Sequence, residues 1–313
     1  MHSIHRPLLK ILLAVLFVLA AAPDLQAAGK RIGVIMTGDI PYYGAIHEKF
    51  LSELNQRIGG AGEFEIILQR PFPDRRSWSN AARKLVAFDV DLIVTYGAPA
   101  THAVIHEKSR IPLVYAGFYE PERAAVNAKN VTGCGFKVPL SSILRYFKRL
   151  KTINSLGIIF SSIEEDSVRQ YESIRLLTTQ QNITTEKIDI RSRQDLDMLK
   201  TKKPDVIFIT GSSLAHLWLD EIISTLDEKS IPVADIFPDE NETGVLMTLY
   251  QPAQAQGEMA AEMAWRILSG TKPSDIIPET MRDTELVFNL LAAKQLGINF
   301  PIQLLIEATR VIE

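Results

Sequence analysis

The sequence predicts an α/β protein of two similar lobes, each a mostly parallel sheet flanked by helices. Residues 91–102 (DLIVTYGAPATH) and 205–216 (DVIFITGSSLAH) repeat one pattern: an apolar run, a turn of small residues and a helix start. An apolar run of this length is typical of a strand that is buried on both faces. Residues 31–36 and 155–160 are a second matching pair of strands. Because these openings recur in the same order, we interpret the chain as a duplicated βαβ architecture, with chance similarity among apolar strands as the alternative.

The first half of the chain alternates short apolar runs with amphipathic segments, as expected for right-handed crossovers in a parallel sheet. Ile46, Phe50 and Leu54 follow a helical spacing, and Gly59-Gly60 ends that helix. Glycines and a proline indicate a loop over residues 37–44. The expected strands are residues 31–36, 64–68, 92–95 and 113–116, and the expected helices are residues 45–58, 74–88 and a segment from Pro99.

The second half repeats this alternation after a glycine-interrupted apolar segment at residues 130–136. We place the first crossing between the lobes near residues 136–140 and expect more than one crossing. Strands are expected near Leu156, Thr184, Val206 and Val233 and at residues 244–249 and 286–288, with helices through Leu150 and at 254–268, 290–296 and 302–308. Lobe 1 is then residues 28–137 plus about 252–276, and lobe 2 is residues 138–251 plus about 277–313.

The N-terminus is typical of a secretory signal peptide. Arg6 and Lys10 precede an apolar run over residues 11–22, and Ala27 offers a small residue for cleavage. This run is short for a membrane span, which needs about 20 residues. We therefore predict a signal peptide over residues 1–27 and a periplasmic mature protein, with an uncleaved anchor as the alternative. The single cysteine, Cys134, excludes an internal disulfide.

Composition and motifs exclude several classes of function. The formal net charge is −3 and no dense basic stripe is present, which argues against a nucleic-acid binder. The chain has no Gly-x-Ser-x-Gly elbow, no His-Glu-x-x-His pair, no Walker-type loop and no Cys or His cluster with metal spacing. We therefore expect no catalytic residue, no metal and no cofactor.

Ligands of open parallel sheets bind beyond the carboxyl ends of the strands, and two facing sheets would share one cleft there. Helix N-termini rich in Gly, Ser and Thr offer free amides for a carboxylate, aromatic residues offer flat walls, and acidic residues suit an ammonium group. A zwitterion would satisfy all three. The candidate ligand-binding residues are Thr37, Gly38, Asp39, Tyr42, Tyr43, Tyr96, Ala98, Pro99, Ala100, Thr101, Gly117, Phe118, Glu120, Ser161, Ser162, Glu164, Gly211, Ser212, Asp235, Phe237 and Tyr250.

Structural roles are the alternative for many of these residues. Loop Ser and Thr are often plain helix N-caps, and about half of the aromatic residues are expected to be core or rim residues. Residues 164–166 (EED) are interpreted as a solvated first helical turn. His102 and His216 occupy equivalent places just inside helices, which favours a repeated structural role over ligation.

Several motifs together resemble one known family. Residues 31–35 (RIGVI), 95–102 (TYGAPATH), 111–116 (IPLVYA) and 130–133 (NVTG) are similar to the ABC-transporter substrate-binding proteins of the tryptophan/tyrosine-binding type. Residues 250–257, 260–264, 267–270 and 289–297 also fit, so the resemblance covers nearly all of the mature chain. It implies a type I periplasmic-binding fold: two Rossmann-like lobes, a three-stranded hinge and a solute enclosed by closure. The site residues that carry over best are Thr37, Ala98, Pro99, Ala100 and Thr101.

Two departures bear on the aromatic amino-acid preference of that family. Residues 119–122 (YEPE) stand where the family commonly has Asp-Pro, and residues 211–213 (GSS) stand where its second lobe often offers Asp.

The leading hypothesis is a monomeric, non-enzymatic, periplasmic solute-binding component of an ABC-type importer. It would bind an amino acid or related zwitterion between its lobes and deliver it to an ABC permease in the inner membrane. A ligand-sensing module for a membrane receptor or kinase is an alternative on the same fold. The third hypothesis is an envelope enzyme that uses Asp39 or Glu120 as acid and base.

Overall fold

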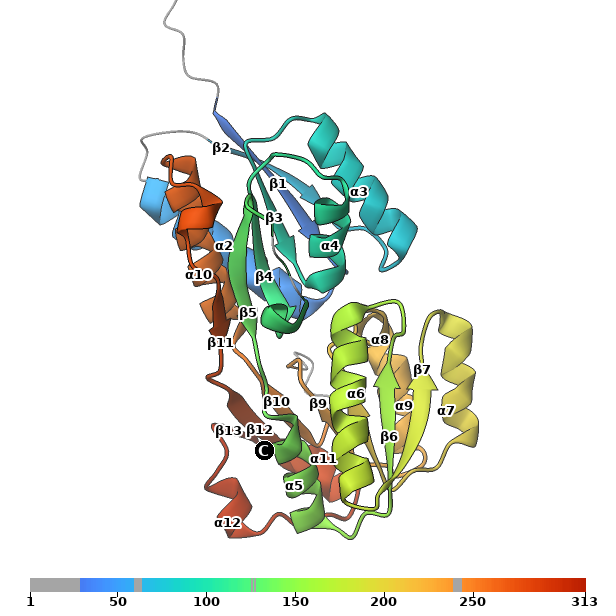
Figure 1. Ribbon diagram of the computed structural model, residues 1–313. Helices are drawn as coiled ribbons and strands as arrows, with labels where there is room; N and C mark the ends of the chain where they lie inside the picture. The colour runs from blue at the N-terminus through green and yellow to red at the C-terminus, as the bar shows by residue number, and fades with distance from the viewer. Residues whose placement is uncertain (1–28, 59–63, 125, 127, 239–243) are drawn as a thin grey trace, which may run out of the picture.

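The computed structural model describes residues 29–58, 64–124, 126, 128–238 and 244–313 (Figure 1). The expected signal peptide at residues 1–27 lies outside this part of the chain. No helix within the described ranges is long and apolar enough to cross a membrane.

The first sheet has six parallel strands in the order β11-β5-β4-β3-β1-β2. Its strands are β1 (Lys30–Met36), β2 (Phe64–Gln69), β3 (Leu92–Tyr96), β4 (Leu113–Tyr119), β5 (Val131–Phe136) and β11 (Glu279–Met281). Its helices are α2 (Pro41–Ile58), α3 (Arg75–Ala87), α4 (Ala98–His106) and α10 (Ala253–Leu268), with the short 3₁₀ turns η1 (Pro121–Ala124) and η3 (Pro273–Asp275). Ile32 and Val34 pack on the α2 and α10 side, whereas Ile35 packs on the α3 and α4 side, so β1 is buried on both faces.

The second sheet has seven strands in the order β13-β12-β10-β9-β8-β6-β7, and only the β10–β12 pair is antiparallel. Its strands are β6 (Ser155–Phe160), β7 (Thr184–Asp189), β8 (Val206–Ile209), β9 (Val233–Asp235), β10 (Met247–Tyr250), β12 (Glu285–Asn289) and β13 (Arg310–Ile312). Its helices are α5 (Leu140–Leu150), α6 (Glu165–Gln180), α7 (Met198–Thr201), α8 (Ser213–Leu217), α9 (Leu219–Asp227), α11 (Leu290–Gln295) and α12 (Ile302–Leu305), with one 3₁₀ turn, η2 (Arg193–Asp197). Two mostly parallel sheets flanked by helices confirm the predicted fold class.

The chain passes between the sheets three times within the described residues: from β5 to α5, from β10 to α10 and from β11 to β12. Figure 1 shows these segments on one side of the molecule. The last passage comes later than the expected boundary near residue 277, because β11 pairs with β5 of the first sheet. Strands of three residues, such as β11 and β13, carry no periodic signal in the sequence.

Helix α2 begins at Pro41, so the predicted loop over residues 37–44 is too long and Tyr42 and Tyr43 are helical. Proline is favoured in the first turn of a helix, where its missing N–H costs nothing. Other boundaries also differ, and the largest differences are at α12, which ends at Leu305 rather than residue 308, at β10, which begins at Met247 rather than residue 244, and at β4, which ends at Tyr119 rather than residue 116.

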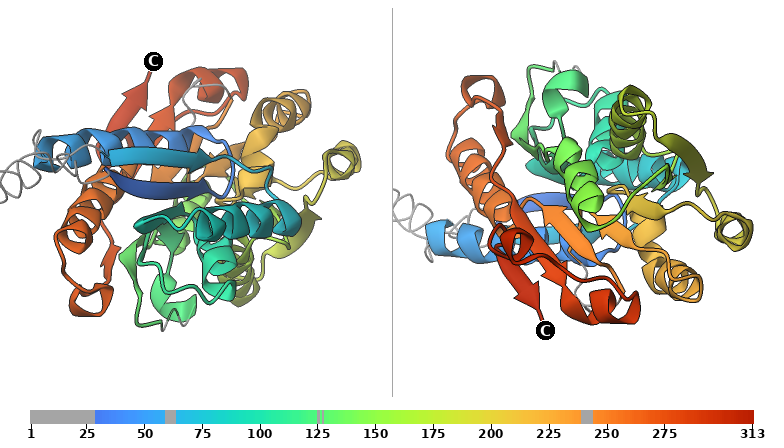
Figure 2. Two further views of the ribbon diagram at one scale, coloured as in Figure 1. Left: turned by 90° about the horizontal axis from the view of Figure 1, so that it is seen from above. Right: turned by 90° about the horizontal axis from the view of Figure 1, so that it is seen from below.

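Helices α2 and α10 lie against each other on one face of the first sheet (Figures 1 and 2). A glycine makes this close approach possible, because a Cβ atom on Gly257 of α10 would lie only 2.5 Å from the backbone oxygen of Ile46. Helix α10 is therefore part of the first lobe although it follows most of the second lobe in the chain.

Candidate functional site

The carboxyl ends of strands from both sheets meet between the lobes. A Cβ atom on Gly38, which follows β1, would lie 2.7 Å from the Cβ atom of Ser213 at the start of α8. Tyr42 of α2 stacks on Phe237, which follows β9, with ring centroids 4.1 Å apart and an interplanar angle of 14°. The lobes are therefore in direct contact.

Polar contacts also cross from one lobe to the other through helix α6. The backbone N–H of Ala98 donates to Asp166 Oδ2 at 3.0 Å, and Arg169 Nη2 donates to the carbonyl of Tyr119 at 3.1 Å. Arg169 also pairs with Asp166 on the same helix. Burial raises the pKa of Asp166 to about 6, and the neighbouring Arg169 guanidinium opposes this rise only in part. Helix α6 thus holds a carboxylate against the first turn of α4 in the opposite lobe.

The first amides of α8 and the Ala98 amide of α4 are not free, contrary to the prediction. Glu164 accepts from Ser213 N–H at 2.7 Å, from Leu214 N–H at 3.1 Å and from the Ser212 hydroxyl at 2.6 Å. Burial raises the pKa of Glu164 despite these hydrogen bonds. At the start of α4, the Ala98 N–H donates to Asp166 of α6 and is therefore not free either. The interpretation of residues 164–166 as a solvated turn is also wrong for Glu164 and Asp166, which are only 1% and 4% exposed.

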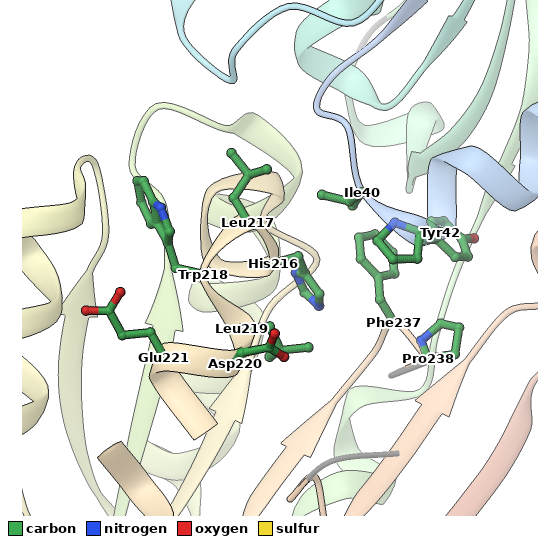
Figure 3. A pocket seen from close by; sticks show the side chains of 11 residues that line it. Ile40, Tyr42, His216, Leu217, Trp218, Leu219, Asp220, Glu221, Phe237 and Pro238 are labelled. Carbon is green, nitrogen blue, oxygen red and sulfur yellow. The ribbon is translucent and has the colours of Figure 1, made fainter. Parts of the chain in front are cut away.

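A cavity of about 290 Å³ lies at the same junction. Figure 3 shows His216 and Asp220 on one side of it and Tyr42, Phe237 and Pro238 on the other. The described residues that line it are Ile40, Pro41, Tyr42, His216, Leu217, Trp218, Leu219, Asp220, Glu221, Phe237 and Pro238. This volume is close to the lower end of the range for small-molecule pockets, about 300 Å³. Both lobes contribute to its walls, so moving the lobes apart would take the cavity apart.

Both ring nitrogens of His216 are occupied. Nδ1 contacts the Ser212 carbonyl at 2.7 Å, and Nε2 lies 3.1 Å from Asp235 Oδ2. Burial lowers the pKa of His216, but the Asp235 carboxylate and these hydrogen bonds outweigh it, so the pKa is above 6.5. The ion pair fixes the wall of the cavity and leaves no imidazole N–H for a ligand.

The raised pKa of His216 predicts a pH-dependent contribution to stability. A group with a raised pKa stabilises the fold fully below its unfolded pKa of about 6.5 and loses this contribution as pH rises through the folded value. The difference in Tm between the ligand-free protein and its His216→Gln variant should therefore be larger at pH 5.5 than at pH 9. Titrating groups that do not interact with His216 are common to both proteins and cancel in the difference. Parallel Tm curves across this range would contradict the prediction.

The sequence comparison identifies the family to which these features belong. Residues 73–312 match the family model for the ABC transporter substrate binding protein. The chain belongs to the ABC transporter substrate-binding protein family. This confirms the predicted resemblance, and it places the chain in a family of binding proteins rather than enzymes.

This substrate-binding protein is similar to a tyrosine-binding protein of Clostridioides difficile, with 21% identity over 271 residues, covering 83% of this chain and 79% of the relative. Its fold is similar to the ABC domain from Streptococcus pneumonia in complex with L-Trp, with a TM-score of 0.83 at 22% identity, covering 91% of this chain and all of the other. The TM-score is 0.62, also at 22% identity, with a ligand-free, open substrate-binding protein with adhesive properties from Clostridium difficile, covering 91% of this chain and 99% of the other.

Most of the predicted site residues of this substrate-binding protein are buried, and several serve the scaffold. Tyr96 bonds His47 Nδ1 at 3.0 Å inside the first lobe, and Thr101 bonds Thr95 at 2.8 Å. The buried members of the predicted set are Thr37, Gly38, Tyr42, Tyr43, Tyr96, Ala98, Pro99, Ala100, Thr101, Gly117, Phe118, Glu120, Ser161, Glu164, Gly211, Ser212, Asp235 and Phe237.

Only Tyr42 and Phe237 of the predicted set line the described cavity, and three others are not buried. Asp39 is exposed and lies 3.6 Å from Arg70. Ser162 donates its N–H to Asp189, and Tyr250 bonds Glu285 on the neighbouring strand β12. Glu120, although buried, has its carboxylate in ion pairs with Arg123 and Lys137.

Sequence reasoning missed Asp166, Arg169, His216 and Asp220 as site residues. The spacing of Asp166 and Arg169, three apart on a predicted helix, is the one sequence signal that indicates a paired carboxylate. The position of that carboxylate against Ala98 depends on how the two lobes meet, and no local pattern encodes it.

Proposed function

We propose that this protein is the periplasmic solute-binding component of an ABC-type importer and closes its lobes on a small organic molecule. The proposed ligand class is an amino acid or a related molecule with an ammonium group and a flat or apolar body. The bound molecule would lie between the lobes and be handed to an ABC permease in the inner membrane. The protein itself would act as a monomer.

The single observation that carries this proposal is the cavity that both lobes line. Tyr42 from one lobe and Phe237 from the other form its aromatic side, and Asp220 contributes a carboxylate. Flat aromatic faces and a carboxylate are the groups that recognise a ring or chain ending in an ammonium group. Similar proteins support the same ligand class, because they include a tyrosine-binding protein and an ABC domain in complex with L-Trp.

Lobe closure is supported by two independent features. Asp166 and Ala98 are bonded across the junction, and Arg169 and Tyr119 make a second bond there. The TM-score is also higher with the L-Trp complex, at 0.83, than with the open ligand-free structure, at 0.62, although the identity is 22% in both cases. A ligand shifts an open–closed equilibrium by its extra affinity for the closed form, so a molecule that touches both lobes favours closure.

The direct test is to unfold freshly purified protein and identify the released small molecules by mass spectrometry. The proposal expects one small metabolite in near-stoichiometric amount, and it expects that molecule to raise the Tm of stripped protein. The absence of any released molecule, together with no Tm increase across a panel of amino acids and amines, would refute it. Uptake of the identified molecule, lost on deletion of the gene and restored by it, separates transport from sensing.

Phe237→Ala is expected to weaken binding of that molecule at least tenfold, because aromatic contacts are worth about 0.5–1.5 kcal/mol beyond the area they bury. Isothermal titration calorimetry measures the change. Phe88→Ala is the matched control, since Phe88 is 43% exposed and lies at the end of α3, away from the cavity. Equal affinities of the two variants for the ligand would show that Phe237 does not contribute to binding.

A further inference from the structure

The charges at the lobe junction narrow the ligand class, if the ligand binds between the lobes as proposed above. Among the residues that the structure describes, the cavity lining includes Asp220 and Glu221 but no lysine or arginine. Its one basic side chain, His216, already uses both ring nitrogens on Ser212 and Asp235. The lining therefore holds no cationic group that could pair with a ligand carboxylate.

Several backbone amides that follow the strands at this junction are also occupied by acceptors of the protein itself. The N–H groups of Ile236 and Phe237 donate to Asp235 Oδ1 at 2.6 and 3.0 Å. Gly211 N–H donates to Gln170 Oε1 at 2.7 Å. The α8 N–H groups donate to Glu164, and Ala98 N–H donates to Asp166. At these positions, side chains of the protein itself accept from amides that could otherwise bind a ligand carboxylate.

The aromatic side of the cavity suits a cation. Tyr42 and Phe237, which are stacked on each other, line one side of the cavity, and Figure 3 shows the side chain of the exposed residue Asp220 on the opposite side. Asp220 has no ion-pair partner within the described residues, whereas Glu221 pairs with Arg193 at 3.0 Å. An ammonium group between a carboxylate and aromatic rings is attracted by both.

We propose that the cavity takes an arylalkylamine, a molecule with an aromatic body and an ammonium group but no carboxylate. A ligand carboxylate would lie either without a cationic partner from the described lining or close to the carboxylates of Asp220 and Glu221. Both outcomes cost free energy, because an unpaired buried charge is costly and like charges repel. An amine without a carboxylate avoids both.

The test compares tyramine with tyrosine, because the two molecules differ only in the carboxylate. Calorimetry with stripped protein should give an affinity for tyramine at least tenfold higher than for tyrosine. 3-(4-Hydroxyphenyl)propionate, which has the carboxylate and no amine, should not bind. Tyrosine binding as tightly as tyramine, or more tightly, would overturn this inference and leave the proposed function intact.

If none of the three compounds binds, the small molecule released from freshly purified protein shows which ligand class the cavity takes. An amine without a carboxylate, identified by mass spectrometry, supports the inference, and a molecule with a carboxylate overturns it. If no molecule is released and no compound raises the Tm, the proposed function fails and this inference fails with it.

Asp220→Asn supplies a test within the protein. It should weaken tyramine binding about fivefold, as expected for the loss of one partly solvated charge pair. Glu221→Gln is the matched control and should change the affinity less than twofold, because Glu221 points away from Phe237 in Figure 3 and pairs with Arg193. Equal effects of the two substitutions would contradict the role of Asp220.

Discussion

Gly38→Ala is expected to weaken ligand binding about tenfold or more while leaving the ligand-free protein folded. The added Cβ atom would lie 2.7 Å from Ser213 Cβ in the opposite lobe and 3.2 Å from Pro73 Cγ. Overpacking of this kind costs about 1–3 kcal/mol, and 1.4 kcal/mol is a tenfold change in affinity. Opening the lobes relieves the contact with Ser213, so the cost falls on the closed, ligand-binding form.

A second substitution separates blocked closure from a local folding defect. Ser213→Gly removes the Cβ atom that the new alanine would meet, so the Gly38→Ala/Ser213→Gly variant should recover most of the lost affinity. Calorimetry measures the affinity of each variant, and the Tm of stripped protein serves as the control for folding. A double variant that binds no better than Gly38→Ala would show that contact across the lobes is not the cause.

Gly257→Val is expected to lower the free energy of unfolding by about 3 kcal/mol, the upper part of the range for overpacked sites. A Cβ atom there would lie 2.5 Å from the backbone oxygen of Ile46 and 2.9 Å from the backbone nitrogen of Phe50. Neither atom belongs to a side chain that could rotate away. The whole of α10 would therefore have to move from α2, and both helices would lose packing against the first sheet.

Urea-induced unfolding of the stripped protein, followed by circular dichroism, measures this loss as a lower midpoint. Gly44→Ala is the control on the same pair of helices, because a Cβ atom on Gly44 meets nothing within 4 Å. That change should raise the stability by about 0.5–1 kcal/mol, since alanine is a better helix former than glycine. A Gly257→Val midpoint equal to that of the unchanged protein would contradict the packing described here.

The sequence predicted the two-lobed fold because its buried strands are long apolar runs that no other element resembles. Strands β1, β3 and β8 are buried along nearly their whole length, and this double burial makes them visible as continuous hydrophobic segments. Strand β13, with three residues at the sheet edge and no buried position, leaves no such trace. Its place depends on pairing with β12, which is a tertiary contact.

The candidate site was harder to predict than the fold, because its chemistry depends on which groups the opposite lobe supplies. Tyr42 and Phe237 could be proposed from their positions after strands, and the structure brings them together at 4.1 Å. Glu164 and Asp166 could not be separated from a solvated helical turn, since an acidic first turn is also what the helix dipole favours. Their role is visible only in the structure, where Asp166 accepts from the Ala98 amide and Glu164 accepts from the Ser213 amide.

The late position of α10 has a consequence for the order in which the protein is made. Residues 253–268 complete the packing of α2, and β11 at residues 279–281 completes the edge of the first sheet. A nascent chain that has emerged from the ribosome only as far as β10 therefore exposes the apolar face of α2 and the edge of β5. Its first lobe is unable to finish folding before nearly the entire polypeptide has been synthesised, and cytosolic chaperones have a prolonged opportunity to bind it.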